Sequence, residues 1–383
     1  MREDSEFVRQ YLRHGNEIPF EPPDDIVPPW AKMQSQQFSE ENRVKSKNDS
    51  ITSRRQFVGG VTAGLAAVLA APALAQQRGI DASSAQSPRQ SSLKDPRTQY
   101  PRPPFPAQQQ EPPGLTGKMN PRPDHGEASY RGSGKLVGRK ALITGGDSGI
   151  GRAAAIAFAR EGADVAINYL PVEEPDAREV VDLIQAEGRK AVPIPGDIRD
   201  ERFCSRLVAD TVRELGGLDI LVNNAATQTM QHSIMDLTTE QFDSTFKTNV
   251  YAMFWITKAA MPHLKPGAVI INTSSVQAYD PSPGLLDYAQ TKACMVSFTK
   301  SLAKQIASQG IRVNAVAPGP FWTPLQPSGG APADAMRTLG EDTPLGRVGQ
   351  PAELAAVYVL LASPESSYAT GQVYGMSGGG GNP

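Results

Sequence analysis

The chain has few cysteines and few histidines. It contains 2 cysteines, Cys204 and Cys294, and 4 scattered histidines in 383 residues. Two cysteines cannot build a framework of disulfides, and neither stands at the short spacing of a metal-binding cluster. The histidines are more simply interpreted as surface or core residues than as zinc ligands. We therefore expect no metal site.

The chain also lacks an excess of charge. Its 38 Lys and Arg against 40 Asp and Glu give a net charge of −2, so no basic surface argues for nucleic acid. Hydrophobic residues make up 39%, which is little for a globular chain of this length. The deficit is local, because many of the 33 prolines precede residue 125. The remainder suffices for one large α/β domain.

The N-terminal third shows no pattern that could build a core. Residues 1–52 are polar and charged, and we expect a disordered extension there. Residues 76–134 begin with a tract rich in Gln, Ser and Pro, which is typical of an extended, partly polyproline-like arm or linker. We expect the folded domain to comprise residues 135–383.

Residues 53–75 have the pattern of an export signal. Arg54-Arg55 precede a Gly/Ala-rich run without charges and then Ala73-Leu74-Ala75, and the whole resembles a twin-arginine signal. A buried helix or a membrane anchor are the alternatives, but glycines and threonines dilute the run of 19 residues from Phe57 to Ala75. We expect periplasmic export, with a cytoplasmic location as the alternative. Because such signals usually stand near the chain start, Met33 is a candidate translation start.

A glycine-rich turn lies between an apolar run and an alanine-rich helix. It belongs to the stretch ALITGGDSGIGR, residues 141–152. Gly145, Gly149 and Gly151 would let the backbone approach a ligand, and the helix N-terminus would face a pyrophosphate. This strand–turn–helix context is required for a dinucleotide fingerprint. A glycine turn without a ligand is the alternative.

Strand and helix patterns alternate after this turn, which predicts a parallel sheet with helices on both faces. Residues 321–346 are expected to be irregular. The strands are expected at 140–144, 164–168, 191–194, 218–222, 268–272, 312–316 and 371–374, and the helices at 153–160, 176–186, 201–215, 239–263, 288–309 and 352–361.

A tyrosine and a lysine share one face of the helix expected at 288–309. Tyr288 and Lys292 are four residues apart, and a nearby ammonium favours the phenolate and lowers the pKa of a tyrosine toward a useful value. Ser275 follows the fifth strand, at the sheet edge where ligands of α/β folds bind. It could hold a carbonyl oxygen, or it could simply be a serine in a turn or helix cap.

Together these motifs make residues 140–383 resemble the short-chain dehydrogenase/reductase family. The resemblance implies a Rossmann-type, doubly wound parallel sheet of about seven strands. It implies Ser275, Tyr288, Lys292 and Asn249 as catalytic residues. One departure is Ala226, where the family has glycine. The implied cofactor residues are Thr144, Gly145, Ser148, Gly149, Ile150, Gly151, Asn168, Tyr169, Asp197, Ile198, Asn224, Ala225, Tyr288, Lys292, Pro318, Gly319 and Thr323.

A narrower resemblance reaches upstream of the domain. Residues 100–106 and 121–127, together with GGDSGIG and SSVQAY, are similar to a subgroup with a proline-rich arm. That subgroup contains stress-associated oxidoreductases and proteins loosely called glucose or ribitol dehydrogenases. Its substrates are poorly defined, so these names do not fix a substrate for this chain.

The resemblance implies reversible hydride transfer between a nicotinamide and a carbonyl or secondary alcohol of an aldehyde, ketone, sugar or polyol. Tyr288 would move the proton, and Lys292 would lower the pKa of Tyr288 and hold the ribose of the cofactor. Ser275 would bind the substrate oxygen, and Asn249 would position a water. A non-catalytic dinucleotide-binding sensor or scaffold is the alternative, and a lyase or epimerase is a third possibility. A homotetramer built from the helices at 239–263 and 288–309 and the last strand is the usual family assembly.

The second strand ends at Asn168-Tyr169, without the acid that marks NAD-binding proteins. Ser148 stands where NADP-preferring relatives often have a basic residue. We therefore expect NAD or NADP, with a slight preference for NAD. The substrate is expected to contact residues 321–346, where Ser328 to Gly330 suggest a mobile lid, and also Gln277 and Tyr279. The expected apolar lining is Phe321, Trp322, Leu325 and Leu339.

Overall fold

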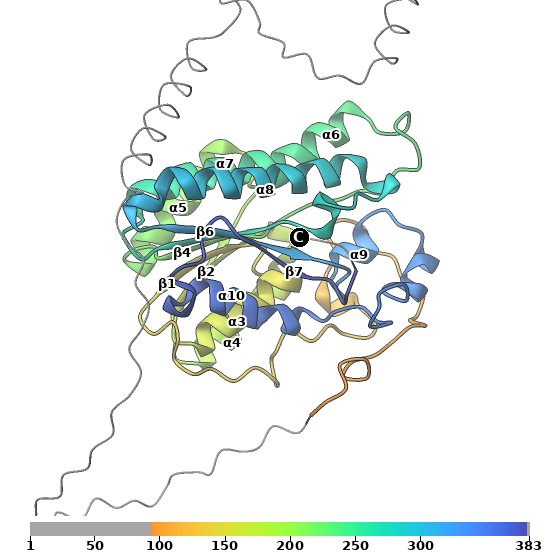
Figure 1. Ribbon diagram of the computed structural model, residues 1–383, viewed down its shortest axis with the longest axis horizontal. Coiled ribbons are helices and arrows are strands. Elements are labelled where there is room, and N and C mark those ends of the chain that lie inside the picture. The colour runs from red at the N-terminus through yellow and green to blue at the C-terminus, as the bar shows by residue number, and fades with distance from the viewer. Residues whose placement is uncertain (1–92, 381–383) are drawn as a thin grey trace, which may run out of the picture. The chain divides into compact units, whose positions relative to one another are not determined.

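The computed structural model describes residues 93–380 (Figure 1). The expected disordered extension, the twin-arginine segment and residues 76–92 of the arm lie outside the described residues. Within the described part of the chain, no helix combines the length and apolarity needed to span a membrane.

Seven strands of residues 93–380 form one parallel sheet in the order β3-β2-β1-β4-β5-β6-β7, which confirms the doubly wound sheet. The central strands are buried along their length because both faces of the sheet are covered, and they are correspondingly apolar. The strands are β1 (Lys140–Thr144), β2 (Asp164–Tyr169), β3 (Ala191–Pro195), β4 (Ile220–Asn223), β5 (Val269–Thr273), β6 (Arg312–Pro318) and β7 (Val373–Met376).

Helices cover the sheet on both faces (Figure 1). On one face lie α3 (Gly149–Arg160), α4 (Glu174–Ala186) and α10 (Pro351–Ala362), and on the other α5 (Glu201–Leu215), α7 (Ala252–Ala260) and α8 (Leu286–Ile306). Each layer buries its own apolar core against the sheet. The chain leaves β1 toward β2 and β3 and later returns to β4 on the other side of β1. The crevice at this switch point, at the carboxyl ends of the strands, is where ligands bind in such folds.

The long helix expected over 239–263 is confirmed as one uninterrupted helical run, but its hydrogen-bonding pattern changes along its length. The chain forms α6 (Thr239–Phe246), a π-helical turn (Lys247–Tyr251), α7 and a short 3-10 turn (Met261–His263). The π-turn contains Asn249, which is fully buried. π-turns inside helices often mark functional sites, because the extra residue redirects a side chain. The region expected to be irregular also contains α9 (Leu325–Ser328) and a 3-10 helix (Ala333–Thr338).

The arm packs on the domain over residues 93–134 (orange to gold in Figure 1), so this part is not a free linker. Phe105 is buried and its ring centroid lies 4.3 Å from that of Trp322. Trp322 Nε1 donates a hydrogen bond of 2.8 Å to the Pro121 carbonyl. These contacts form a small core between the arm and the domain, which also includes Met119 and Val348. Few apolar side chains suffice here because prolines reduce the conformational entropy that the segment loses on folding.

Candidate active site

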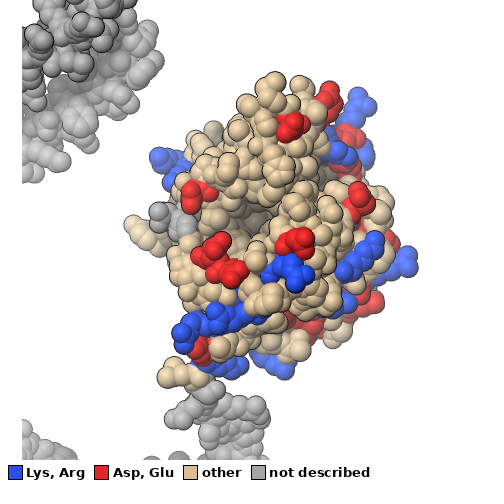
Figure 2. All heavy atoms as spheres, turned by 90° about the vertical axis from the view of Figure 1, so that its right-hand side faces the viewer, with Lys and Arg blue, Asp and Glu red and all other residues tan. Residues whose placement is uncertain are grey.

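A pocket of about 790 Å³ opens at the carboxyl edge of the sheet. Figure 2 views the molecule from this side and shows the hollow in its surface. The glycine turn, the ends of β2 and β3, the segments after β4, β5 and β6, and α8 all contribute to its wall. Of the residues expected to bind the cofactor, all line the pocket except Thr144 and Gly151, which lie behind the turn.

The glycines of the turn are required by its shape. Gly145 and Gly149 have φ angles of 62° and 50°, where side chains are strained. A Cβ on Gly151 would lie 2.0 Å from the Gly145 carbonyl oxygen. Ser148 precedes α3 without capping it through its side chain. The first turn of α3 therefore leaves N–H groups available at the pocket, which suits the pyrophosphate of a dinucleotide.

Ser275, which follows β5, meets Tyr288 and Lys292, which both lie on α8, in the pocket wall. The Lys292 ammonium lies 5.2 Å from the centroid of the Tyr288 ring and donates a hydrogen bond of 2.7 Å to the Thr273 carbonyl. Tyr288 and Lys292 are both buried. The three side chains therefore present a hydroxyl, a phenol and an amine to one space.

Burial controls the acidity of this pair. It raises the pKa of Tyr288 to about 12, while the hydrogen bond with Ser275 acts in the opposite direction. Burial also lowers the pKa of Lys292 to about 7. Removing both groups from water disfavours both charged forms, so burial opposes the lowering of the Tyr288 pKa that a charged Lys292 would cause. The phenol is protonated at neutral pH, and the amine is poised between its two forms.

Asn249 lies beneath the pocket and not in its wall. Its Oδ1 accepts a hydrogen bond of 2.9 Å from the Thr227 N–H, and its Nδ2 donates to the Thr227 carbonyl and to the Thr291 hydroxyl at 2.9 and 3.0 Å. Both amide hydrogens are thus used by protein partners. The side chain joins the segment after β4 to the helix that carries Tyr288 and Lys292.

At the other end of the pocket, the Asn168 amide donates to the Ile194 and Gly196 carbonyls, both at 3.1 Å, and so ties β2 to β3. Two acids that the sequence interpretation missed also line this end, Asp147 of the glycine turn and Glu173 after β2. In the sequence, the only indication of an acid at this place is the aspartate within GGDSGIG, which is Asp147. Burial and the nearby Glu173 raise the pKa of Asp147 well above its usual range.

The substrate end contains part of the expected lining. Phe321, Leu325 and Leu339 line the pocket, whereas Trp322 is fully buried against the arm. Gln277 also lines it, whereas Tyr279 does not. Hydrogen bonds fix the segment around the expected lid, Ser328 to Gly330, on two sides. The Gln110 N–H donates to the Pro327 carbonyl, and the Met230 N–H donates to the Gly329 carbonyl.

The arm contributes directly to the pocket. Pro112, Pro113 and Gly114 line it, which the sequence interpretation did not foresee. A Cβ on Gly114 would lie 2.6 Å from the Pro324 carbonyl oxygen, so the arm approaches the lid segment closely. The arm therefore shapes the same wall as the lid.

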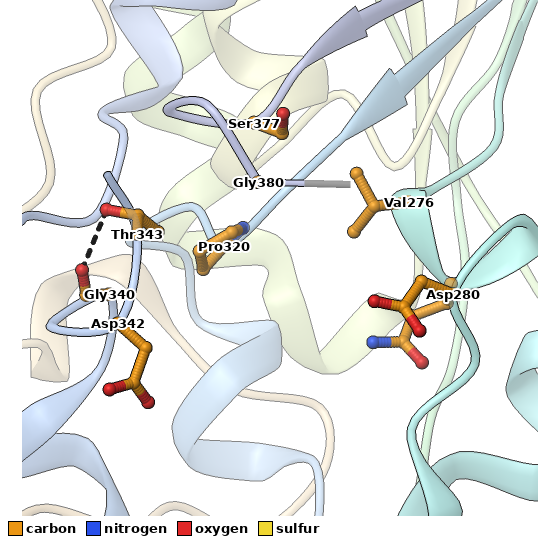
Figure 3. A pocket seen from close by; sticks show the side chains of 9 residues that line it. Val276, Asp280, Pro320, Gly340, Asp342, Thr343, Ser377 and Gly380 are labelled. Carbon is orange, nitrogen blue, oxygen red and sulfur yellow. Dashed lines mark hydrogen bonds between the residues drawn. The ribbon is translucent and has the colours of Figure 1, made fainter. Parts of the chain in front are cut away.

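A second pocket, of about 290 Å³, adjoins the first and shares Val276, Gln277 and Pro320 with it. Figure 3 shows Asp280 and Asp342 on opposite sides of this space. No group of metal ligands occurs among residues 93–380. The shared residues make this pocket an extension of the substrate end.

Comparisons with known proteins place these features in a family. Residues 145–380 match the family model described as Enoyl-(Acyl carrier protein) reductase. The oxidoreductase YhxD of Bacillus subtilis is 63% identical over 278 residues, which are 72% of this chain and 93% of that protein. A chloroplastic protein of Arabidopsis thaliana named NADPH-dependent aldehyde reductase 1 is 43% identical over 273 residues, 70% of this chain and 94% of that protein.

A solved structure supports the same family. The short chain dehydrogenase from Burkholderia cenocepacia J2315, in complex with NADP, superposes with a TM-score of 0.60 at 37% identity over 64% of this chain and 98% of its own. The seven-stranded parallel sheet agrees with these matches. The chain therefore belongs to the short-chain dehydrogenase/reductase family and is an oxidoreductase of the kind that uses a nicotinamide dinucleotide.

Proposed function

We propose that the protein transfers a hydride reversibly between NAD(P) and the carbonyl or secondary alcohol of an aldehyde, ketone, sugar or polyol. The observation that supports this most directly is the placement of Ser275, Tyr288 and Lys292 in the same pocket as the glycine turn. The name of the Arabidopsis relative, an aldehyde reductase that uses NADPH, agrees with the reaction type. The bound nicotinamide would supply or accept the hydride.

The pocket offers the cofactor a cradle along its length. The backbone of Gly145 and Gly149 and the first turn of α3 would hold the pyrophosphate. Asp197 and Ile198 would lie against the adenine, and Thr323 would lie at the nicotinamide end. A Cβ on Gly149 would lie 3.1 Å from Thr323 Cγ2, so the turn leaves little room for a side chain there.

Each residue at the reacting end has a distinct role. Tyr288 would give its proton to the substrate oxygen during reduction and take it back during oxidation. Ser275 would donate a hydrogen bond to the same oxygen. Lys292, with a pKa near neutrality, would stabilise the phenolate in its charged form and hold the cofactor ribose. Asn249 would act as a positioning residue, through Thr227 and Thr291.

Replacement of the tyrosine tests the assignment. Tyr288→Phe removes only the hydroxyl, so we expect NAD(P)H binding by fluorescence titration to persist. Turnover of a panel of aldehydes, ketones and sugars should fall by about 10²–10⁴-fold, the usual contribution of general acid–base catalysis. Tyr368→Phe, at an exposed tyrosine, serves as the control. Near-parental turnover in Tyr288→Phe would refute the mechanism.

A sensor or scaffold of the same fold is the alternative function. It would bind the cofactor but turn over no member of the panel. The buried acid–base set argues against it, because a protein that only binds has no need of a phenol and an amine taken out of water. A lyase or epimerase would convert substrate without net NAD(P)H oxidation, so the same panel distinguishes all three.

We also propose assembly into a homotetramer. Phe242 on α6, Tyr251 in the π-turn and Phe254 on α7 are 36%, 45% and 46% exposed. Large exposed apolar side chains on neighbouring turns favour association. Light scattering after size exclusion would give the assembly. Phe254→Glu should shift it toward smaller species, and a monomeric parent protein would contradict the proposal.

Export of the protein is a further proposal, supported by Arg54-Arg55 and Ala73-Leu74-Ala75 in the sequence. The twin-arginine route carries folded proteins, so a cofactor bound before export would reach the periplasm with the enzyme. Because free nicotinamide cofactors are scarce outside the cytoplasm, a tightly held cofactor or an unused signal are the two ways to reconcile export with redox chemistry. Cell fractionation of the parent and of an Arg54→Lys/Arg55→Lys variant separates them.

A further inference from the structure

The arm reaches the larger pocket through a loop that folds back on itself. Two glutamine side chains close this loop, one inside the other. Gln108 pairs with the Asn120 backbone, accepting from its N–H and donating to its carbonyl. Inside this pair, Gln110 accepts a hydrogen bond of 2.7 Å from the Leu115 N–H and donates one of 3.2 Å to the Leu115 carbonyl. Residues 111–114, which we call the arm tip, are thereby held in a closed turn.

The arm tip is joined to the lid segment that follows β6. The Gln110 N–H donates a hydrogen bond of 3.0 Å to the Pro327 carbonyl. A Cβ on Gly114 would lie 2.6 Å from the Pro324 carbonyl oxygen, so backbone meets backbone there. Pro324 also borders the glycine turn, because a Cβ on Gly149 would lie 4.0 Å from the Pro324 Cδ. The lid segment therefore adjoins both the arm tip and the turn.

The chain is fixed a second time directly after the arm tip. The Thr116 N–H donates a hydrogen bond of 2.6 Å to Oδ2 of Asp176, near the start of α4. Both residues are buried, and a buried hydrogen bond to a carboxylate is strong and costly to break. Asp176 lies close enough to the glycine turn to act on Asp147, whose pKa is raised by burial, by Glu173 and by Asp176. The arm is thus tied to the lid segment and to α4, which both adjoin the turn.

The arm tip shares the pocket with the residues expected to hold the cofactor. Pro112, Pro113 and Gly114 line it together with Gly145 and residues 147–150 of the glycine turn. These three tip residues carry no charge, and the two prolines have a restricted backbone and no N–H to donate. The tip therefore offers a dinucleotide a stiff, uncharged surface, which would act on NAD and NADP alike.

We propose that the arm tip is a strap, which closes over the pyrophosphate of the bound dinucleotide and must open before the cofactor can enter or leave. This inference rests on the proposed dinucleotide site. The ties at Pro324 and Asp176 lie beside the turn that would hold the pyrophosphate, so the tip covers that part of the pocket. A segment that covers a site slows association and dissociation together, because both pass through the open state.

The kinetics of cofactor exchange test the strap. The full chain is loaded with NADPH and mixed with an excess of NADP⁺, and the fall in the fluorescence of bound NADPH gives the dissociation rate. Mixing the free protein with NADPH gives the association rate. Gln110→Ala removes both side-chain hydrogen bonds to Leu115 and should raise both rates by about tenfold, the usual worth of one or two hydrogen bonds.

Gln108→Ala is the matched control for this variant. It removes the outer glutamine pair from the same arm but leaves the inner pair and both ties of the tip in place. Both rates should therefore stay near those of the parent protein. Equal acceleration in Gln108→Ala would indicate a general loosening of the arm and would contradict the strap.

A second variant displaces the arm tip by a different route. In Gly114→Ala the new Cβ would meet the Pro324 carbonyl oxygen, so the tip must move and both rates should rise again. Thermal unfolding verifies that each variant is folded, and either variant suffices if the other is not.

Two results would overturn the strap. One is unchanged rates in both variants, and the other is faster dissociation with an unchanged association rate, which would show that the tip contacts the bound cofactor without covering its path. If the parent protein binds neither NADPH nor NADH, the proposed function itself fails.

Discussion

The Thr144 hydroxyl accepts a hydrogen bond of 2.9 Å from the main-chain N–H of Asn224. The same hydroxyl accepts a second one, of 3.1 Å, from the Ala225 N–H. In return the Asn224 side-chain amide donates to the Thr144 and Gly145 carbonyls at 3.1 and 3.2 Å. The glycine turn after β1 and the loop after β4 are thereby joined into one unit, although 80 residues separate them. These two segments form facing parts of the pocket wall.

Removing the Thr144 hydroxyl should loosen this unit. In Thr144→Val two main-chain N–H groups lose their acceptor without a change in side-chain shape. We expect a loss of about 1–3 kcal/mol in the free energy of unfolding, together with weaker cofactor binding. Urea unfolding and NADH titration measure the two effects. Thr144→Ser keeps the hydroxyl and should stay near the parent, and equal behaviour of both variants would contradict the interpretation.

A methyl group at Gly151 should be poorly tolerated. Its carbon would lie 2.0 Å from the Gly145 carbonyl oxygen and 2.6 Å from the Asn224 amide nitrogen, so the turn must move. We expect Gly151→Ala to lose about 1–3 kcal/mol of stability and most of its affinity for NADH. Gly117→Ala is the matched control, since a Cβ there meets nothing within 4 Å. A Gly151→Ala protein that unfolds and binds like the parent would show that the turn is more adaptable than its geometry indicates.

Truncating Phe105 should release the arm. Its ring fills the small core with Trp322, and cutting a buried Phe to Ala typically costs about 3–5 kcal/mol. Because the main domain has its own cores, we expect faster proteolytic cleavage within residues 93–134 and not global unfolding. The pocket should open at Pro112 to Gly114, so KM should rise. Tyr368→Ala removes an exposed aromatic and should change neither measurement. Unaltered protease protection in Phe105→Ala would contradict this account.

Glu173 should make the protein less stable as pH rises from about 4.5 to 7. Burial raises its pKa from 4.5 to about 7, so the folded chain holds a proton that the unfolded chain has released in this window. The free energy of unfolding therefore falls as pH increases through this window. Above and below the window, the contribution of Glu173 does not change with pH. Glu173→Gln cannot ionise and should flatten the curve. Urea unfolding at a series of pH values measures this, and an identical slope in the variant would rule out the assignment.

Much of the fold could be predicted because the buried strands are short apolar runs between glycines and polar turns. The bounds of β1 agree with the expected ones, and those of β2 to β7 differ from them by one or two residues. The helical run over 239–263 was predicted with its observed bounds, whereas the π-turn within it was not. Within the π-turn, the Asn249 side chain makes hydrogen bonds with Thr227 and Thr291, which come from other segments. Periodicity within one helix does not contain that information.

The candidate site could likewise be predicted from the sequence only in part. The glycine turn and the spacing of Tyr288 and Lys292 are local patterns, and residues near strand ends meet at one edge of a parallel sheet. Asp147 and Glu173, by contrast, belong to different turns, and only the register of β1 and β2 brings those turns side by side. The proline-rich arm was similarly expected to be an arm or linker, since its sequence carries few apolar residues to show that it packs.

By itself the sequence determined the kind of sheet, the place of the glycine turn and the chemistry of the groups available at its edge, since these follow from local patterns of apolar, glycine and titratable residues. Only the tertiary structure decided that the arm forms part of the pocket and that Asn249 faces inward. It also decided that the pKa of Tyr288 rises to about 12 while that of Lys292 falls to about 7. Burial and contacts between distant segments set these properties, and both exist only once the chain has folded.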